Sequence, residues 1–215
     1  MAVVITASEP SWTAPFTGLS PRDFRKLMTM LRREGADTVR PGRPWSLPLE
    51  DRVLLVAAYW RTDLTLRQLA PLFGVSKPAA DRIIDHVGPL LALKPRHRFR
   101  KDTALIVDGT LVPTRDRTIA EKSKNYRYST NHQVVADGGY PGTGLVIPHR
   151  RPKGGELTEW QTEHNRDHKR VRARVEHVFA RMKTWKILRD RRLKGDGVHH
   201  AMLGVARLHN LIQAT

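Results

Sequence analysis

The chain has 215 residues, 40% of them hydrophobic, which suffices for one or two domains with a modest core. Lysine and arginine number 38 against 21 acidic residues, and the resulting formal charge of +17 favours a polyanionic partner such as nucleic acid. The lack of cysteine excludes disulfides and thiolate metal sites, and no apolar run approaches the roughly 18 residues of a membrane span. The short apolar start, without preceding basic residues, does not resemble a signal peptide, so we expect a soluble, cytoplasmic protein.

The first half of the chain is predicted to be helical. Ser20 and Asp23 are spaced as a helix N-cap and its capping-box partner, and Pro21 suits a first helical turn. Apolar residues then recur every three or four positions, which is typical of a helix with one buried face. The expected helices span 19–35, 49–61, 65–74 and 76–88, with a proline-rich linker over 38–48.

The second half mixes strand and helix patterns. Runs of aliphatic and β-branched residues predict strands over 104–113, 125–135 and 145–148, and helical periodicity predicts helices over 157–186 and 197–213. We therefore expect an all-helical domain over 1–93, a basic linker over 94–101 and an α/β domain over 102–215.

A helix-turn-helix is predicted within 65–88. Ala70 lets two helices approach, Gly74 takes the turn, and Ala80 and Ile83 anchor the second helix on the first. The outward positions of the second helix would then face the major groove; they are Ser76, Lys77, Asp81, Arg82 and His86. The alternative is an ordinary pair of packed helices whose charges are simply solvated.

The segment 166–194 concentrates positive charge, with 12 lysines and arginines against three acidic residues. A solvated helix face is the usual meaning of such a run, but charge of one sign repels itself unless an anion such as phosphate screens it. Glu176 is an isolated acid inside this segment. It is either a functional carboxylate or the partner of Arg172 in a surface ion pair worth about 0.3–0.5 kcal/mol.

Two aspartates stand at apolar strands. Asp108 lies within the aliphatic run LIVDGT, and Asp137 follows VVA and precedes two glycines. Carboxylates are costly in such places unless they are exposed or used, and hard oxygen ligands suit Mg²⁺. Two such ions can promote phosphodiester hydrolysis. Turn-forming Asp-Gly pairs are the alternative for each aspartate taken singly.

These motifs together resemble a known family. VDGTLVPTRDRTIAEKSKNYRYSTNHQVV, ADGGYPGTGLVIPHR and RVRARVEHVFARMKTWKILRD look like the nuclease domain of bacterial insertion-sequence transposases of the DDE class, and 47–87 resembles their helix-turn-helix domain. The resemblance implies an RNase H-like α/β fold with a metal-binding triad of Asp108, Asp137 and Glu176, binding Mg²⁺ or Mn²⁺. It also implies duplex DNA as the partner, an association with the nucleoid, a possible homodimer, and neither a membrane nor a small-molecule substrate. The predicted DNA-contacting residues are Ser76, Lys77, Arg82, Lys122, Lys124, Arg170, Arg172, Arg174 and Lys183.

The spacing of the aspartates departs from the family. Only 29 positions separate Asp108 from Asp137, too few for two further strands, a crossover helix and a parallel return. We infer an internal loss of about one strand-helix unit near 135/136. Either 131–136 then becomes the parallel neighbour of the Asp108 strand, or it stays antiparallel and Asp137 is misplaced. We expect impaired catalytic geometry in either case.

The leading prediction is a DDE transposase that recognises DNA, cleaves phosphodiesters with metal ions and transfers strands, in an impaired copy. The alternative is a non-catalytic helix-turn-helix DNA-binding protein, such as a repressor or a transposase remnant. A general basic nucleic-acid binder is a third possibility.

Overall fold

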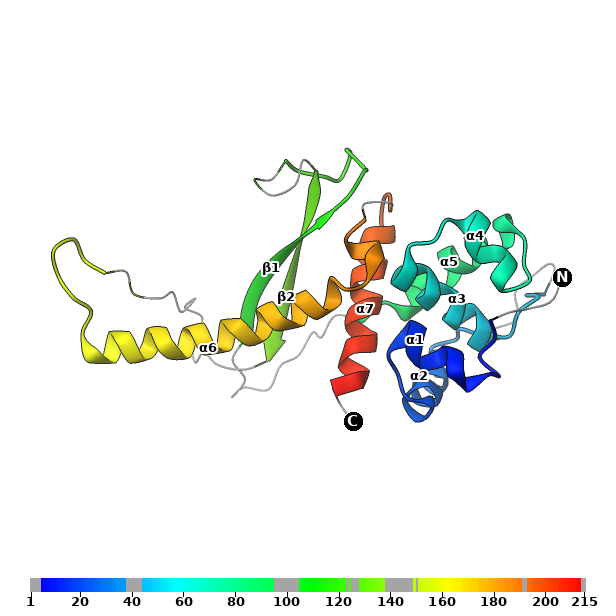
Figure 1. Cartoon of the computed structure of the whole chain (residues 1–215), viewed down its shortest axis with the longest axis horizontal. Helices are drawn as coiled ribbons and strands as arrows, with labels where there is room; N and C mark the ends of the chain where they lie inside the picture. Colours follow the sequence, from blue (N-terminus) through cyan, green and yellow to red (C-terminus); the bar gives the residue numbers. More distant parts are fainter. Residues whose placement is uncertain are drawn as a thin grey trace. The chain divides into compact units, whose positions relative to one another are not determined.

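The computed structural model describes residues 5–37, 44–94, 105–122, 124, 128–137, 149, 151–190 and 193–213 (Figure 1). The chain forms two compact units. The first combines Met1–Lys94, Val112–Thr130 and Met182–Thr215, and the second combines Pro95–Leu111 and Asn131–Arg181. The C-terminal segment is therefore part of the same unit as the N-terminal helices.

The first unit begins with short helices and one longer amphipathic helix. A 3-10 turn, η1 (Pro10–Trp12), leads into α1 (Thr13–Thr17) and α2 (Pro21–Arg33). The Ser20 hydroxyl accepts a hydrogen bond from the Asp23 amide at 3.2 Å, which confirms the predicted N-cap. The predicted apolar face of α2 is also confirmed, since Phe24, Leu27, Met28 and Leu31 are all buried.

Helix α3 (Leu49–Thr62) forms the centre of this unit. Its residues from Val53 to Ala58 are each at most 1% exposed, so it is buried on every side rather than along one stripe. Neighbours in contact with it include α1, α5 (Lys77–Leu91) and the 3-10 turn η2 (Lys186–Leu188). A helix buried on all sides needs covering elements, and two of these come from distant parts of the chain.

The C-terminal helix α7 (Gly197–Gln213) supplies part of that cover. The Trp60 ring of α3 is 2% exposed and lies directly against the backbone of α7 at Gly204. A Cβ atom built on Gly204 would lie 2.2 Å from Cζ3 and 2.3 Å from Cη2 of Trp60. Only a residue without a side chain fits at this point, so the glycine permits the close approach.

A buried arginine joins α7 to two other helices. Arg207 is 4% exposed and donates hydrogen bonds to the Glu34 carboxylate at 2.8 Å and to the Leu90 carbonyl at 3.0 Å. Burial by itself raises the pKa of Glu34, but the hydrogen bonds and charges of Arg207 and Lys94 outweigh it and lower that pKa below its ordinary value. The ion pair therefore ties the C-terminal helix to the end of α2 and to α5.

The strands β1 (Leu105–Pro113) and β2 (Ser129–Asp137) form a two-stranded antiparallel sheet. The Thr114 amide donates to the Tyr128 carbonyl at 3.3 Å, just beyond the strand ends. In the first unit this end of the ribbon is tied to the chain before α7, because the Thr114 hydroxyl donates to the Leu193 carbonyl at 3.1 Å. The Gly195 amide also donates to the Asp116 carboxylate, at 2.7 Å.

Several element predictions need correction. The second strand runs over Ser129–Asp137 rather than 125–135, and α6 (Glu159–Met182) ends four residues before the predicted 186. The chain leaves the helix there because Trp185, Ile187 and Leu188 turn inward and become buried. The predicted strand over 145–148 lies outside the described residues. In the part of the chain that the structure describes, the sheet has two strands rather than the larger mixed sheet of an RNase H-like fold.

Among the helices that the structure describes, none is long and apolar enough to cross a membrane.

The close approach of Gly204 to Trp60 predicts that alanine substitutions at two glycines facing this ring have opposite effects on the free energy of unfolding. Gly204→Ala should lower the free energy of unfolding by about 1–3 kcal/mol, because the added methyl group over-packs the core. Gly88→Ala is the matched control, since its Cβ would meet Trp60 at an ordinary 3.8 Å. It should be neutral or stabilising by up to about 1 kcal/mol, as expected for alanine in a helix. Urea denaturation measures both, and equal effects would contradict the close packing.

The Arg207–Glu34 pair predicts a pH-dependent contribution to stability. The folded pKa of Glu34 is lowered, so its contribution is present above the ordinary value of 4.5 and is lost as the pH falls through the folded pKa. Arg207→Leu should therefore reduce the free energy of unfolding at neutral pH, and this difference should shrink in the acid range. Denaturant titrations across pH test this, with Glu34→Gln as the control that removes the titrating group.

Candidate nucleic-acid interface

The helix-turn-helix consists of α4 (Leu66–Leu72) and α5. Thr65 and Gln68 form the predicted capping box at the start of α4, with the Thr65 amide donating to the Gln68 side chain at 3.1 Å. Gly74 has a φ of +64° in the turn, a backbone conformation that glycine adopts without strain. The Ser76 hydroxyl accepts from the Ala79 amide at 3.3 Å and caps α5.

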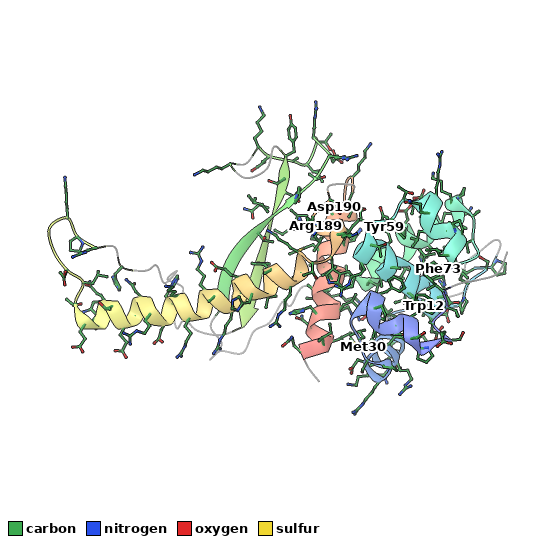
Figure 2. The ribbon with its side chains drawn as sticks, viewed as in Figure 1. Trp12, Met30, Tyr59, Phe73, Arg189 and Asp190 are labelled. Carbon is green, nitrogen blue, oxygen red and sulfur yellow. The ribbon has the colours of Figure 1, made fainter. Side chains whose placement is uncertain are left out.

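The two helices pack as predicted. Ala70, Ala80 and Ile83 are at most 1% exposed, and Phe73, labelled in Figure 2, fills the space at the turn with its ring fully buried. The opposite surface of α5 is open, since Ser76, Lys77, Asp81 and Arg82 are all exposed. The arrangement therefore presents the N-terminal half of α5 to a partner, where a recognition helix contacts bases.

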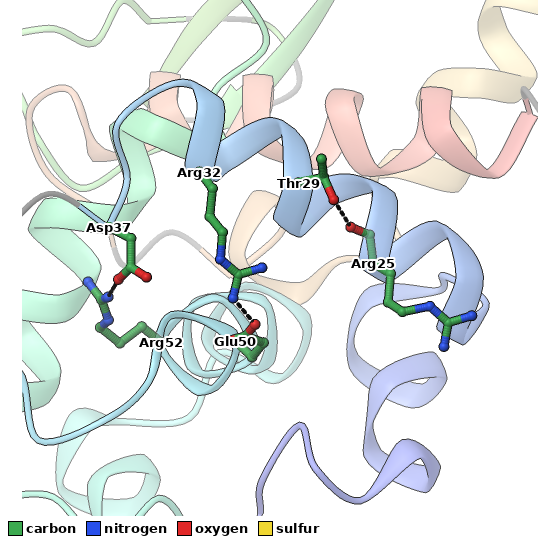
Figure 3. A network of polar contacts seen from close by, with 6 residues as sticks. All are labelled: Arg25, Thr29, Arg32, Asp37, Glu50 and Arg52. Carbon is green, nitrogen blue, oxygen red and sulfur yellow. Dashed lines mark hydrogen bonds and ion pairs between the residues drawn. The ribbon is translucent and has the colours of Figure 1, made fainter.

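His86 has a structural role that the sequence analysis missed. Its ring stacks on Trp45 with a centroid distance of 5.2 Å, and the Arg52 guanidinium lies 5.2 Å from the Trp45 ring. Arg52 is 2% exposed and pairs with Asp37 at 2.7 Å, as Figure 3 shows. Desolvation lowers the pKa of Arg52 despite the nearby carboxylate. This stack braces α5 against α3, so His86 is not an open groove-reading residue.

The predicted basic contacts outside α5 lie on two further elements. Lys122 and Lys124 are exposed in the connection between β1 and β2. Arg170, Arg172 and Arg174 are exposed on α6, which Figure 2 shows with side chains projecting along its length. Lys183 follows the end of α6 and is half-buried.

Glu176 lies on the exposed surface of α6. The Arg172 Nε atom donates to its carboxylate at 3.0 Å, and the two side chains are 59% and 57% exposed. The surface ion pair considered as an alternative from the sequence is therefore present. At this exposure it contributes only about 0.3–0.5 kcal/mol, so it would yield readily to a competing ligand.

Asp108 and Asp137 occupy neighbouring strands at offset positions. The strands have equal length, and their register places Asp137 opposite Leu105 and Asp108 opposite Val134. Three positions separate the two aspartates along the ribbon, about 10 Å at the usual rise per residue.

The metal-binding triad of Asp108, Asp137 and Glu176 stays a prediction, because the side chains of the two aspartates lie outside the described part of the structure. Two ions acting on one phosphodiester lie about 3.5–4 Å apart and need carboxylates that converge on them. The register separates the two aspartate positions, and Glu176 is paired with Arg172. Among the described residues, no group of three or more histidine, aspartate or glutamate side chains is placed to hold a metal ion.

Comparisons with known proteins identify the family. Residues 101–210 match the model of the DDE superfamily endonuclease, and residues 45–96 match the helix-turn-helix of the DDE superfamily endonuclease. A protein of Streptomyces albus G, described as a transposase for insertion sequence element IS112, is 70% identical over 252 residues, covering 98% of each chain. A protein of Microchaete diplosiphon, described as a transposase for insertion sequence element IS702, is 24% identical, covering 80% of this chain and 83% of its own. No solved structure matches.

The class defined by these matches is a helix-turn-helix joined to a metal-dependent endonuclease domain. The chain belongs to the DDE superfamily endonucleases, among the insertion-sequence transposases. The resemblance read from the sequence is thereby confirmed. Endonucleases of this superfamily use divalent metal ions.

Proposed function

We propose that this chain is a transposase that binds duplex DNA but does not cleave it. The helix-turn-helix carries sequence recognition, and the exposed cations of α6 and of the β1–β2 connection contact phosphates. Specific binding would be directed at the ends of an insertion sequence. Action as a homodimer stays a prediction, since no described feature bears on it.

The DNA-binding half of the proposal is supported by the surface of α5. A capped helix with a buried inner face and an exposed Ser76, Lys77 and Arg82 has the geometry that a recognition helix needs. The charge of +17 adds the sequence-independent attraction to phosphate that accompanies such recognition.

The loss of cleavage is supported chiefly by the pairing of β2 with β1. Asp137 is the last residue of β2, which pairs antiparallel with β1, the strand of Asp108. The resemblance to the family predicts the second aspartate on a strand parallel to that of the first, so the antiparallel pairing does not give the expected arrangement. The alignment with the Streptomyces albus G protein spans 252 residues, 37 more than the 215 of this chain. That excess supports an internal loss of about one strand-helix unit.

Removing the exposed cations of α5 tests the DNA-binding half. Lys77→Ala with Arg82→Ala should weaken binding to insertion-sequence ends by at least about tenfold, because each contact to base or phosphate contributes about 1–3 kcal/mol. Lys186→Ala with Arg189→Ala is the charge-matched control, since these two exposed cations of the same unit lie outside α5, α6 and the β1–β2 connection. Fluorescence anisotropy with labelled duplexes measures the change. Unaltered affinity in the double variant would contradict recognition through α5.

A cleavage assay tests the other half. The chain should leave end-sequence duplexes intact with Mg²⁺ or Mn²⁺ while still shifting them in a gel, because β2 pairs antiparallel with β1 and so Asp137 does not lie on a parallel neighbour of the Asp108 strand. Asp108→Ala should then alter neither binding nor cleavage. Metal-dependent cutting that Asp108→Ala abolishes would instead establish a working triad and overturn the impairment.

A further inference from the structure

Helix α2 carries a basic stripe on its exposed face. With 3.6 residues per turn, its five cationic residues fall within about a third of the helix circumference, opposite the buried apolar face. The members of this α2 stripe are Arg22, Arg25, Lys26, Arg32 and Arg33, and all are exposed. The one acidic residue of the helix, Asp23, is 4% exposed and does not neutralise the outer surface.

Internal ion pairs use only part of this stripe. Lys26 pairs with Asp23 at 2.7 Å, and Arg32 reaches Glu50 on α3, as the dashed line in Figure 3 shows. Arg22, Arg25 and Arg33 pair with none of the carboxylates in the described part of the chain. In Figure 3 the Arg25 guanidinium extends away from the helix, and the Thr29 hydroxyl bonds only to its backbone carbonyl, at 3.0 Å. Three cations of the stripe are therefore available to an outside partner.

The arginines near the N-terminus of α2 do not stabilise the helix, so helix stability does not explain why they are there. Arg32 and Arg33 at the C-terminal end interact favourably with the helix dipole, but Arg22 and Arg25 lie near the N-terminus, where the dipole disfavours positive charge. Arg22 also stands three and four positions before Arg25 and Lys26, and like charges at these spacings destabilise a helix by a few tenths of a kcal/mol. A polyanion bound along the stripe would convert this repulsion into attraction.

We infer that the α2 stripe is a second contact surface for the phosphate backbone of duplex DNA, separate from the helix-turn-helix. This inference rests on the proposed DNA binding and extends it. The helix lies before both segments that match the family, 45–96 and 101–210, so neither match assigns it a role. A membrane surface is a poor partner, because Phe24, Leu27 and Leu31 are buried inside the unit and leave no apolar face to insert.

The stripe lies apart from the recognition helix pair. Figure 1 draws α2 at the end of the first unit away from α4, with α3 between them. The bound phosphates therefore belong to base pairs that α5 does not cover. These phosphates belong either to the flank of the duplex that α5 binds or to a second duplex held by the same chain. Both sources present the same phosphate backbone to the stripe.

The salt dependence of binding tests this surface. Each neutralised phosphate contributes about 0.9 to the slope of log affinity against log salt concentration. Replacing Arg22, Arg25 and Arg33 by alanine should therefore lower that slope by about 2–3 on a duplex of about four helical turns. The matched control replaces the same three residues by lysine and should keep the slope, because phosphate contacts depend on charge. Alanine relieves the repulsion in α2, so circular dichroism should show an intact fold.

A duplex of about one helical turn separates the two sources. If the stripe binds the flank of the same duplex, the short duplex should show no change in slope with the alanine variant. If it binds a second duplex, the wild type should take up two short duplexes per chain and the alanine variant one.

Two results would overturn the inference, and they differ in what else they affect. If the wild type binds DNA normally and the alanine variant shows the same salt slope, the α2 stripe is not a DNA contact, and the proposed function still holds. That result would point to an acidic protein as the partner of the stripe. A wild type without affinity for either duplex removes the proposed function as well.

Discussion

The burial of α3 is the constraint on which the first unit depends. A helix that is buried on every side cannot be covered by its sequence neighbours alone, so η2 and α7 return from the far end of the chain to complete the cover. The close approach of Trp60 to Gly204 and the pair of Arg207 with Glu34 fasten this return. The recognition helix α5 packs on both α3 and α7, so its support includes residues that belong to the endonuclease match.

The second constraint is the length of chain between the two aspartates. A parallel neighbour requires a crossover connection, whereas an antiparallel neighbour needs only a reversal of the chain. With 29 positions available, β2 pairs antiparallel to β1 and carries Asp137 to the far end of the ribbon. The acidic residues of the family motif persist in the sequence, while the topology that would bring them together is absent from the described sheet. Family membership and catalytic competence are therefore separate questions for this chain.

Charge is distributed over more than one surface. The helix-turn-helix surface is nearly balanced, because Asp81 and Asp85 on α5 offset Lys77 and Arg82. The excess of positive charge lies elsewhere, on α6 and on the outer face of α2. With the excess charge on other helices than α5, the reading of sequence and the attraction to phosphate fall on different elements, and they are physically distinct contributions to binding.

Local patterns predicted much of the helical part. The caps at Ser20, Thr65 and Ser76 depend on hydrogen bonds between near neighbours, and the buried faces of α2 and α5 follow from helical periodicity. The basic stripe of α2 was not predicted from the sequence, although it has the same periodicity as the apolar face opposite. The family, too, followed from motifs that survive as sequence.

The sequence by itself thus determined what near neighbours decide: the presence of the helices, their N-terminal caps, the helix-turn-helix and the family. Tertiary structure alone decided that α6 stops at Met182 so that Trp185 can be buried, and that His86 stacks on Trp45. It also decided that the C-terminal helix belongs with the N-terminal ones, and that Asp137 pairs beside the strand of Asp108 in an antiparallel sense. These outcomes depend on contacts between residues far apart in the chain, where burial and strand register compete with local preference and prevail.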